Sequence, residues 1–213
     1  MMLKTNYEGE ELTHRRLWRI VEQNAKMTSE CAEGWFYPTL VSEVFAFHTI
    51  EAYINFVGER IAPEIWNDER NYFHKEPYRG WDGKLRKILE LVGLSYDRDK
   101  PPMSSVLKLR NIRDLIAHGK PETIAGEVVH LPDTDPPILP QSTLVTAVAA
   151  REDLPAILAD VEGFLDAIHT RAAPIVQQRW GSTAKATWFG TQALRGSARY
   201  GGSLTTLHRP EKD

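Results

Sequence analysis

A chain of 213 residues, 42% of them hydrophobic, can form one globular domain with appendages, or two small domains. Its formal net charge of −3 excludes the overall basic field that attracts nucleic acid or an anionic membrane. Cys31 is the only cysteine, which excludes an intrachain disulfide and a CxxC metal site.

The first expected element is a helix over residues 11–31, where apolar residues recur at helical spacing between charged ones. We assign residues 1–35 to an N-terminal helical extension. The sequence before this helix does not look like a signal peptide, and no apolar run approaches the roughly 18 residues of a membrane span. We therefore expect a cytoplasmic protein that makes no contact with a membrane.

The longest amphipathic segment follows. Apolar residues over 38–61 form a stripe wide enough for a central bundle helix. Residues 62–81 contain two prolines and Gly80, and they predict a long loop. A third helix is expected to begin with Asp82 as its N-cap and to end before Gly93.

The fourth expected helix ends in the segment RNIRDLIAHGK, residues 110–120. Ser104 or Ser105 is its expected N-cap, and His118 is its last residue. Gly119 is expected to adopt the left-handed conformation that often follows a helix, and Pro121 prevents continuation.

Residues 120–150 differ in character from the rest. The stretches ETIAGEVVHL and STLVTAVAA favour β structure, and four prolines lie between them. A last helix is expected after Asp153, with Pro155 in its first turn. We therefore predict an all-α fold, a bundle of about five helices with a β-leaning, irregular insertion before the last helix.

Polar residues on the fourth helix form a stripe beside its apolar face. On an ideal helix Asn111, Asp114 and His118 lie within about 60° of one another, whereas Arg113 lies about 140° from His118. Spacing alone favours a structural explanation, in which His118 interacts with the helix dipole and with Asp114 one turn earlier. The competing explanation is a catalytic arginine and histidine, with the missing group supplied by a second chain.

The segment LRNIRDLIAHG resembles the signature of the HEPN domain family, an arginine and a polar residue followed by a histidine after four to six positions. Arg113, Asp114 and His118 match this signature, and the segment FHTIEAYINFVGERI is similar to an early HEPN helix. The resemblance covers about residues 38–172. It implies a HEPN-like bundle over 36–176, between the extension and a tail over 177–213.

Many HEPN domains are metal-independent ribonucleases whose site forms where two domains pair. The resemblance therefore implies a homodimeric endoribonuclease with RNA as its substrate and no cofactor or metal. It also suggests a toxin or antiphage effector, with an antitoxin or regulatory protein as a partner. His118 would be the general acid/base, Arg113 would clamp the phosphate, and Asp114 would orient one of them. The expected supporting residues are Asn111, Glu51 and Asn55, with an internal hydrogen bond or an exposed seam as the alternative for the last two.

Two residues depart from the HEPN pattern. Lys120 stands where HEPN toxins paired with minimal nucleotidyltransferase antitoxins usually carry a tyrosine, and Asp114 stands where asparagine is frequent. Some HEPN domains are non-catalytic, so a module that binds protein or RNA is the alternative function. In a third interpretation the chain is a helical interaction protein and RDLIAH is only a capped helix end.

The tail over 177–213 is basic, with six Lys/Arg and two Asp/Glu, whereas the remainder holds 20 Lys/Arg and 27 Asp/Glu. Positive charge interleaved with aromatic rings is typical of single-stranded nucleic-acid binding. Docking of the rings on the bundle or on a second protomer is an equal alternative. The candidate RNA-binding residues are Arg179, Trp180, Lys185, Trp188, Arg195 and Arg199.

The seven histidines show neither HxxxH nor HExxH spacing, which argues against a metal site. His48 is interpreted as a packed histidine of the longest helix. His74 lies in the segment NYFHKEPYRGW, which would either flank a cleft or form a solvated loop, and the solvated loop is favoured.

Overall fold

The structure, a computed structural model, describes residues 10–123, 142–190 and 192–195. Every regular element in these ranges is a helix, which confirms the all-α class. The long helices are α1 (Thr13–Glu30), α2 (Phe36–Ile61), α5 (Gly80–Val92), α6 (Met103–Ala117) and α8 (Leu154–Trp180). The short helices are α3 (Pro63–Trp66), α4 (Glu69–Tyr72), α7 (Thr143–Ala147) and α9 (Ala184–Phe189).

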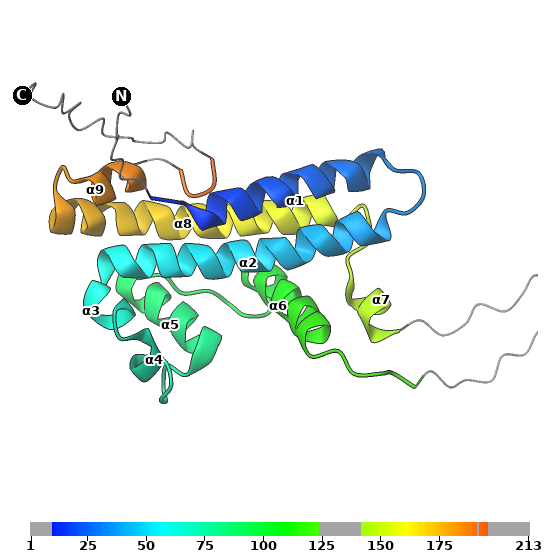
Figure 1. Cartoon of the computed structure of the whole chain (residues 1–213), viewed down its shortest axis with the longest axis horizontal. Helices are drawn as coiled ribbons and strands as arrows, with labels where there is room; N and C mark the ends of the chain where they lie inside the picture. The colour runs from blue at the N-terminus through cyan, green and yellow to red at the C-terminus, as the bar shows by residue number, and fades with distance from the viewer. Residues whose placement is uncertain (1–9, 124–141, 191, 196–213) are drawn as a thin grey trace, which may run out of the picture.

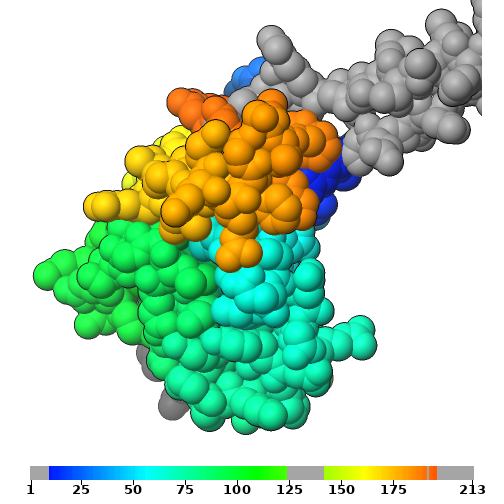
Figure 2. All heavy atoms as spheres, turned by 90° about the vertical axis from the view of Figure 1, so that its left-hand side faces the viewer, coloured from blue at the N-terminus to red at the C-terminus, as the bar shows by residue number. Residues whose placement is uncertain are grey.

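Helix α2 is the centre of the bundle, as its apolar stripe predicts. It contacts α1, α5, α6 and α8, and Figure 1 shows α5 and α6 on the side of α2 opposite α1. The α2 side chains Phe47, Ile50 and Tyr53 are at most 1% exposed. Figure 2 shows α8 and α9, in yellow and orange, packed above the cyan and green residues of α2–α6.

Helix α1 belongs to the same core as α2. Trp18 and Val21 are 2% and 0% exposed and join the core cluster formed by the other long helices. The Ser42 hydroxyl of α2 also donates a hydrogen bond of 3.3 Å to the Val21 carbonyl. The expected domain boundary at residue 36 therefore does not separate two packing units.

The expected long loop over 62–81 contains α3 and α4. Helix α5 begins at Gly80 with Arg79 as its N-cap residue, so the expected cap Asp82 lies inside the first turn. The Arg110 guanidinium of α6 donates to both Asp82 carboxylate oxygens at 2.8 and 2.7 Å. Gly83 allows the chain to approach closely here, since a Cβ at this position would lie 1.8 Å from the Tyr78 carbonyl oxygen. The start of α5 is thus joined both to the preceding turn and to α6.

The stretch STLVTAVAA contains α7, although its sequence favours β structure. The Ser142 hydroxyl accepts a hydrogen bond from the Val145 N–H at 3.2 Å, and the Glu122 carboxylate accepts one from the Thr143 N–H at 2.9 Å. This local capping outweighs the β-propensity of the valine and threonine residues. Residues 124–141, with most of ETIAGEVVHL and all four prolines, lie outside the described residues.

Helix α8 continues past Pro174 to Trp180, so the expected start of the tail at residue 177 falls inside a helix. The chain then folds back through α9. The Phe189 ring is 1% exposed and stacks on His169 with ring centroids 4.3 Å apart. The Trp180 indole donates a hydrogen bond of 2.8 Å to the Arg60 carbonyl. The described part of the tail, to residue 195, is therefore packed on the bundle.

Candidate functional site

The predicted motif forms the last turn of α6. His118 is the C-cap residue, and its N–H donates to the Asp114 carbonyl at 3.0 Å. Gly119 is not left-handed, unlike Gly34, Gly80, Gly93 and Gly181 among the described glycines, so the expected glycine cap is wrong. The helix ends without one, because His118 itself leaves the helical conformation with φ −119° and ψ 20°.

The Asp114 carboxylate turns toward arginine and not toward histidine. It accepts a hydrogen bond of 2.8 Å from the Arg113 guanidinium and lies 3.6 Å from Nε of Arg110. His118 is exposed, and its side chain has no hydrogen bond or ion pair with any described residue. The ordinary Asp114–His118 pair, one helical turn apart, is therefore not formed. The position of Asp114 suits it to orient Arg113.

Arg113 is half-buried against α2. Its guanidinium carbon lies 5.8 Å from the centre of the Phe47 ring, and Nη2 lies 3.9 Å from the Glu51 carboxylate. Nδ1 of His48 lies 3.0 Å from the other Glu51 oxygen. The carboxylates of Asp114 and Glu51 therefore hold the arginine from two directions.

The other two expected supporting residues lie elsewhere. Asn111 is exposed. The Asn55 side-chain oxygen accepts hydrogen bonds from the Lys84 ammonium at 3.1 Å and from the Trp66 indole at 3.4 Å. Of the three expected supporting residues, Glu51 alone contacts Arg113 in the described structure.

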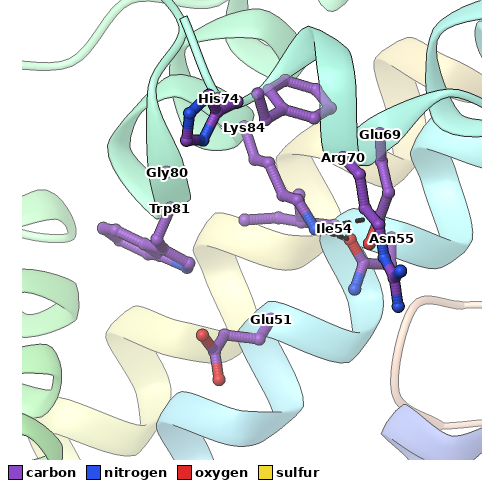
Figure 3. Close-up of a pocket in the computed structure, with 10 residues that line it drawn as sticks. Glu51, Ile54, Asn55, Glu69, Arg70, His74, Gly80, Trp81 and Lys84 are labelled. Carbon is purple, nitrogen blue, oxygen red and sulfur yellow. Dashed lines mark hydrogen bonds and ion pairs between the residues drawn. The ribbon is translucent and has the colours of Figure 1, made fainter.

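A cavity of about 380 Å³ lies beside the Arg113–Glu51 pair, between α2, α4 and the start of α5 (Figure 3). Glu51 and Asn55 are on its wall, so the two α2 positions singled out by the sequence do face a shared space. His74 also lines the cavity, although the sequence favours a solvated loop there. Sequence reasoning missed the remaining lining residues, which are Ile54, Glu69, Arg70, Phe73, Gly80, Trp81 and Lys84.

The Trp81 ring connects the cavity to the motif. Its centroid lies 5.1 Å from that of Phe47, and the Arg110 guanidinium carbon lies 5.2 Å from it. The Arg113 guanidinium also packs over the Phe47 ring, so Trp81 of the cavity wall and Arg113 contact the same aromatic side chain. The two features form one continuous region across α2, α5 and α6.

The candidate RNA-binding residues of the tail contact their own bundle. The Arg179 guanidinium donates to Glu64 at 3.0 Å, and that of Arg195 donates to Glu162 at 2.7 Å. The Lys185 ammonium lies 4.2 Å from the Trp180 ring centre. Trp188 is half-buried, and Arg199 lies outside the described residues. RNA binding by these residues stays a prediction.

Glu43 is a buried carboxylate outside the motif. It is 0% exposed on α2, and it accepts a hydrogen bond of 3.0 Å from the Ala149 N–H while its second oxygen has no hydrogen-bond partner in the described structure. Burial raises the pKa of this carboxyl from 4.5 to about 7. Glu43 therefore changes its charge near neutral pH at the point where the segment after α7 joins α2.

Among the described residues, no helix is long and apolar enough to cross a membrane, and no group of three or more His, Cys, Asp or Glu residues is placed to hold a metal ion. Comparison with models of known protein families finds no match, and neither the curated proteins nor the solved structures include a match to the chain.

Proposed function

We propose that the chain is a HEPN-like, metal-independent endoribonuclease that acts as a homodimer, with Arg113 and His118 as its catalytic pair. One observation carries the proposal: Asp114 holds the guanidinium of Arg113 while the imidazole of His118 stays exposed and unpaired with any described residue. The motif thus provides a positioned cation and an imidazole open to solvent. A role as a toxin or antiphage effector, controlled by an antitoxin or regulatory protein, belongs to the same proposal.

RNA cleavage by this pair needs no metal, because the substrate supplies the nucleophile. The 2′-oxygen bonds to the adjacent phosphorus as the bond from phosphorus to the 5′-oxygen breaks. One His118 imidazole accepts the proton of the 2′-hydroxyl, and a second imidazole gives a proton to the departing 5′-oxygen. The guanidinium of Arg113 stabilises the charge that gathers on the phosphate oxygens. The products are a 2′,3′-cyclic phosphate and a 5′-hydroxyl.

The second imidazole comes from a second protomer in this proposal. On one helix Arg113 and His118 point about 140° apart, and no hydrogen bond joins their side chains in the described structure. Helices α6 and α7 contact each other, and each carries an exposed apolar side chain, Ile116 at 42% and Val145 at 40%. A second copy that covers this apolar surface would bring its own His118 to the same place.

The protein is therefore expected to be a dimer at micromolar concentration, with twice the chain mass of 24.2 kDa in light scattering. Ile116→Asp should shift it toward monomer, because a carboxylate would be buried at the interface. Met27→Asp, at a residue of α1 that is 52% exposed, is the control and should stay dimeric. A wild type that remains monomeric at all concentrations would remove the two-chain site.

The alternative is a non-catalytic HEPN module that binds protein or RNA. It is favoured by the two carboxylates around Arg113, because a guanidinium paired in this way has less charge to offer a phosphate. Single-turnover cleavage of labelled single-stranded RNA in EDTA separates the two functions. Cyclic phosphate products support the enzyme, and RNA binding without cleavage over a broad panel supports the module.

A further inference from the structure

The cavity beside Arg113 has an aromatic and aliphatic side. Trp81 and Phe73 contribute rings to its lining, and Ile54 contributes an alkyl group. Figure 3 shows Trp81 and Arg70 on opposite sides of the space, with Ile54 and Glu51 between them. Its volume of about 380 Å³ falls in the range of about 300–1,000 Å³ that is typical of small-molecule sites. The space therefore suits a flat group of limited size.

The charges around the cavity leave a positive excess on one side. The Glu69 carboxylate is paired with the Lys84 ammonium at 2.9 Å, and the Glu51 carboxylate is shared between Arg113 and His48. Arg70 is exposed and has no hydrogen bond or ion pair with any described residue. The unpaired guanidinium of Arg70 thus favours an anionic ligand. The rings of Trp81 and Phe73 favour a ligand that also carries an aromatic group.

The polar groups on α2 suit the edge of a nucleobase. The Glu51 carboxylate offers hydrogen-bond acceptors, and the Asn55 amide nitrogen, one turn later, has no bond with a described residue and offers a donor. Along its Watson–Crick edge every base combines N–H donors with acceptor atoms. The distance of 3.9 Å between Glu51 and Arg113 makes this wall continuous with the proposed cleavage site.

We infer that the cavity binds one nucleotide of a single-stranded RNA, with its base stacked on Trp81 and its backbone phosphate held by Arg70. His74 lines the same cavity and is exposed, and it lies on the side of Gly80 and Trp81, across the space from Arg70 (Figure 3). The inference rests on the proposed function for the identity of the ligand, and it places the strand so that a neighbouring phosphate reaches Arg113. Binding at this subsite does not require cleavage.

The test is fluorescence anisotropy with a labelled, single-stranded 2′-O-methyl RNA of ten nucleotides, which lacks the attacking hydroxyl and is not cleaved. Trp81→Ala should weaken binding by about 5- to 150-fold, the usual effect of losing one base-stacking ring. Arg70→Ala should weaken binding. It should also reduce the slope of log Kd against log salt concentration by about 0.7, the value for one lost phosphate contact on a single strand. Arg86→Ala is the matched control, because Arg86 is exposed on α5 and donates to the Pro77 carbonyl.

Because Trp81 packs on Phe47, thermal melts must show that each variant is folded, and Arg70→Ala provides a test that does not disturb the core. Arg70→Ala binding with wild-type affinity and salt dependence overturns the subsite, even if cleavage by the wild type depends on His118. A wild type that binds no single-stranded RNA also overturns it. If the Arg70 and Trp81 variants bind weakly while the wild type cleaves no RNA, the subsite is supported and the ribonuclease proposal fails.

Discussion

Replacing His118 with alanine is expected to slow RNA cleavage by about 10²–10⁴-fold, the usual contribution of a general acid or base. The fold should be almost unaffected, because the side chain is exposed and has no hydrogen bond or ion pair with a described residue. A histidine kept only for its interaction with the helix dipole would contribute about 0.3–1 kcal/mol to stability and nothing to cleavage. The measurement is single-turnover cleavage of single-stranded RNA in EDTA, with a thermal melt of each variant.

Arginine variants test the second half of the pair. Arg113→Ala should also lose most of the cleavage rate, through lost stabilisation of phosphate charge. Arg113→Lys should recover only part of it, because lysine keeps the charge but lacks the planar fork that binds two oxygens. Arg86→Ala, on the outer side of α5, is the matched arginine control and should cleave like the wild type.

The reaction product gives an independent check. A 2′,3′-cyclic phosphate is expected, because the attacking oxygen belongs to the substrate. If the wild type cleaves and His118→Ala cleaves equally well, the assignment of His118 is wrong while the family resemblance can still hold. A preparation whose activity disappears in EDTA would contradict the metal-independent reaction.

The long helices could be predicted from the sequence because each carries an apolar stripe of helical period. The stripe over 38–61 indicates the central position of α2, and Asp153 with Pro155 places the start of α8. The expected serine cap of α6 is wrong, because Pro102 is the N-cap residue and both Ser104 and Ser105 lie inside the helix. The errors fall where a tertiary contact or a local cap decides. The sequence predicts Asp82 as a helix cap, but its carboxylate accepts a hydrogen bond from Arg110. The β-prone residues of α7 form a helix whose N-terminus is capped by the Ser142 side chain.

The candidate site could be predicted only in part for the same reason. Helical periodicity selects Glu51 as a polar position on an apolar helix, but it does not show that Arg113 lies 3.9 Å from it. Helical spacing places Asp114 one turn from both Arg110 and His118, so it does not decide which of them the carboxylate faces, and the hydrogen bond from the adjacent Arg113 follows from no helical spacing. The cavity depends on how α4 and the start of α5 are positioned relative to α2. A short sequence pattern does not predict this long-range arrangement.

Glu43 gives the second large effect, on stability as a function of pH. Its pKa in the folded chain is about 7, raised from 4.5 by burial, so the folded state holds a proton between these values that the unfolded state has lost. The contribution of this group to the free energy of unfolding is fully present below pH 4.5, falls as the pH rises to about 7, and is lost above it. The total is on the order of 3 kcal/mol.

His14 acts in the opposite direction and hides this effect in the wild type. Burial lowers the pKa of its imidazole from 6.5 to about 3, with further lowering by the nearby charges of Arg15 and Arg60. The unfolded chain therefore binds the extra proton between these values, and stability rises with pH there. The two contributions overlap between about pH 4.5 and 6.5, so the pH profile of the wild type alone does not isolate Glu43.

The difference between Glu43→Gln and the wild type isolates the carboxylate. Glutamine keeps an acceptor for the Ala149 N–H but cannot ionise, so the variant should match the wild type near pH 4.5 and exceed its stability at pH 8 by on the order of 3 kcal/mol. Urea unfolding followed by circular dichroism at these two pH values measures the difference, and Glu33→Gln, at an exposed position, controls for removing a carboxylate at the surface. A variant no more stable than the wild type at pH 8 would show that the Glu43 charge is compensated in the folded chain, with Lys108, whose charge lowers this pKa, as the source of that compensation.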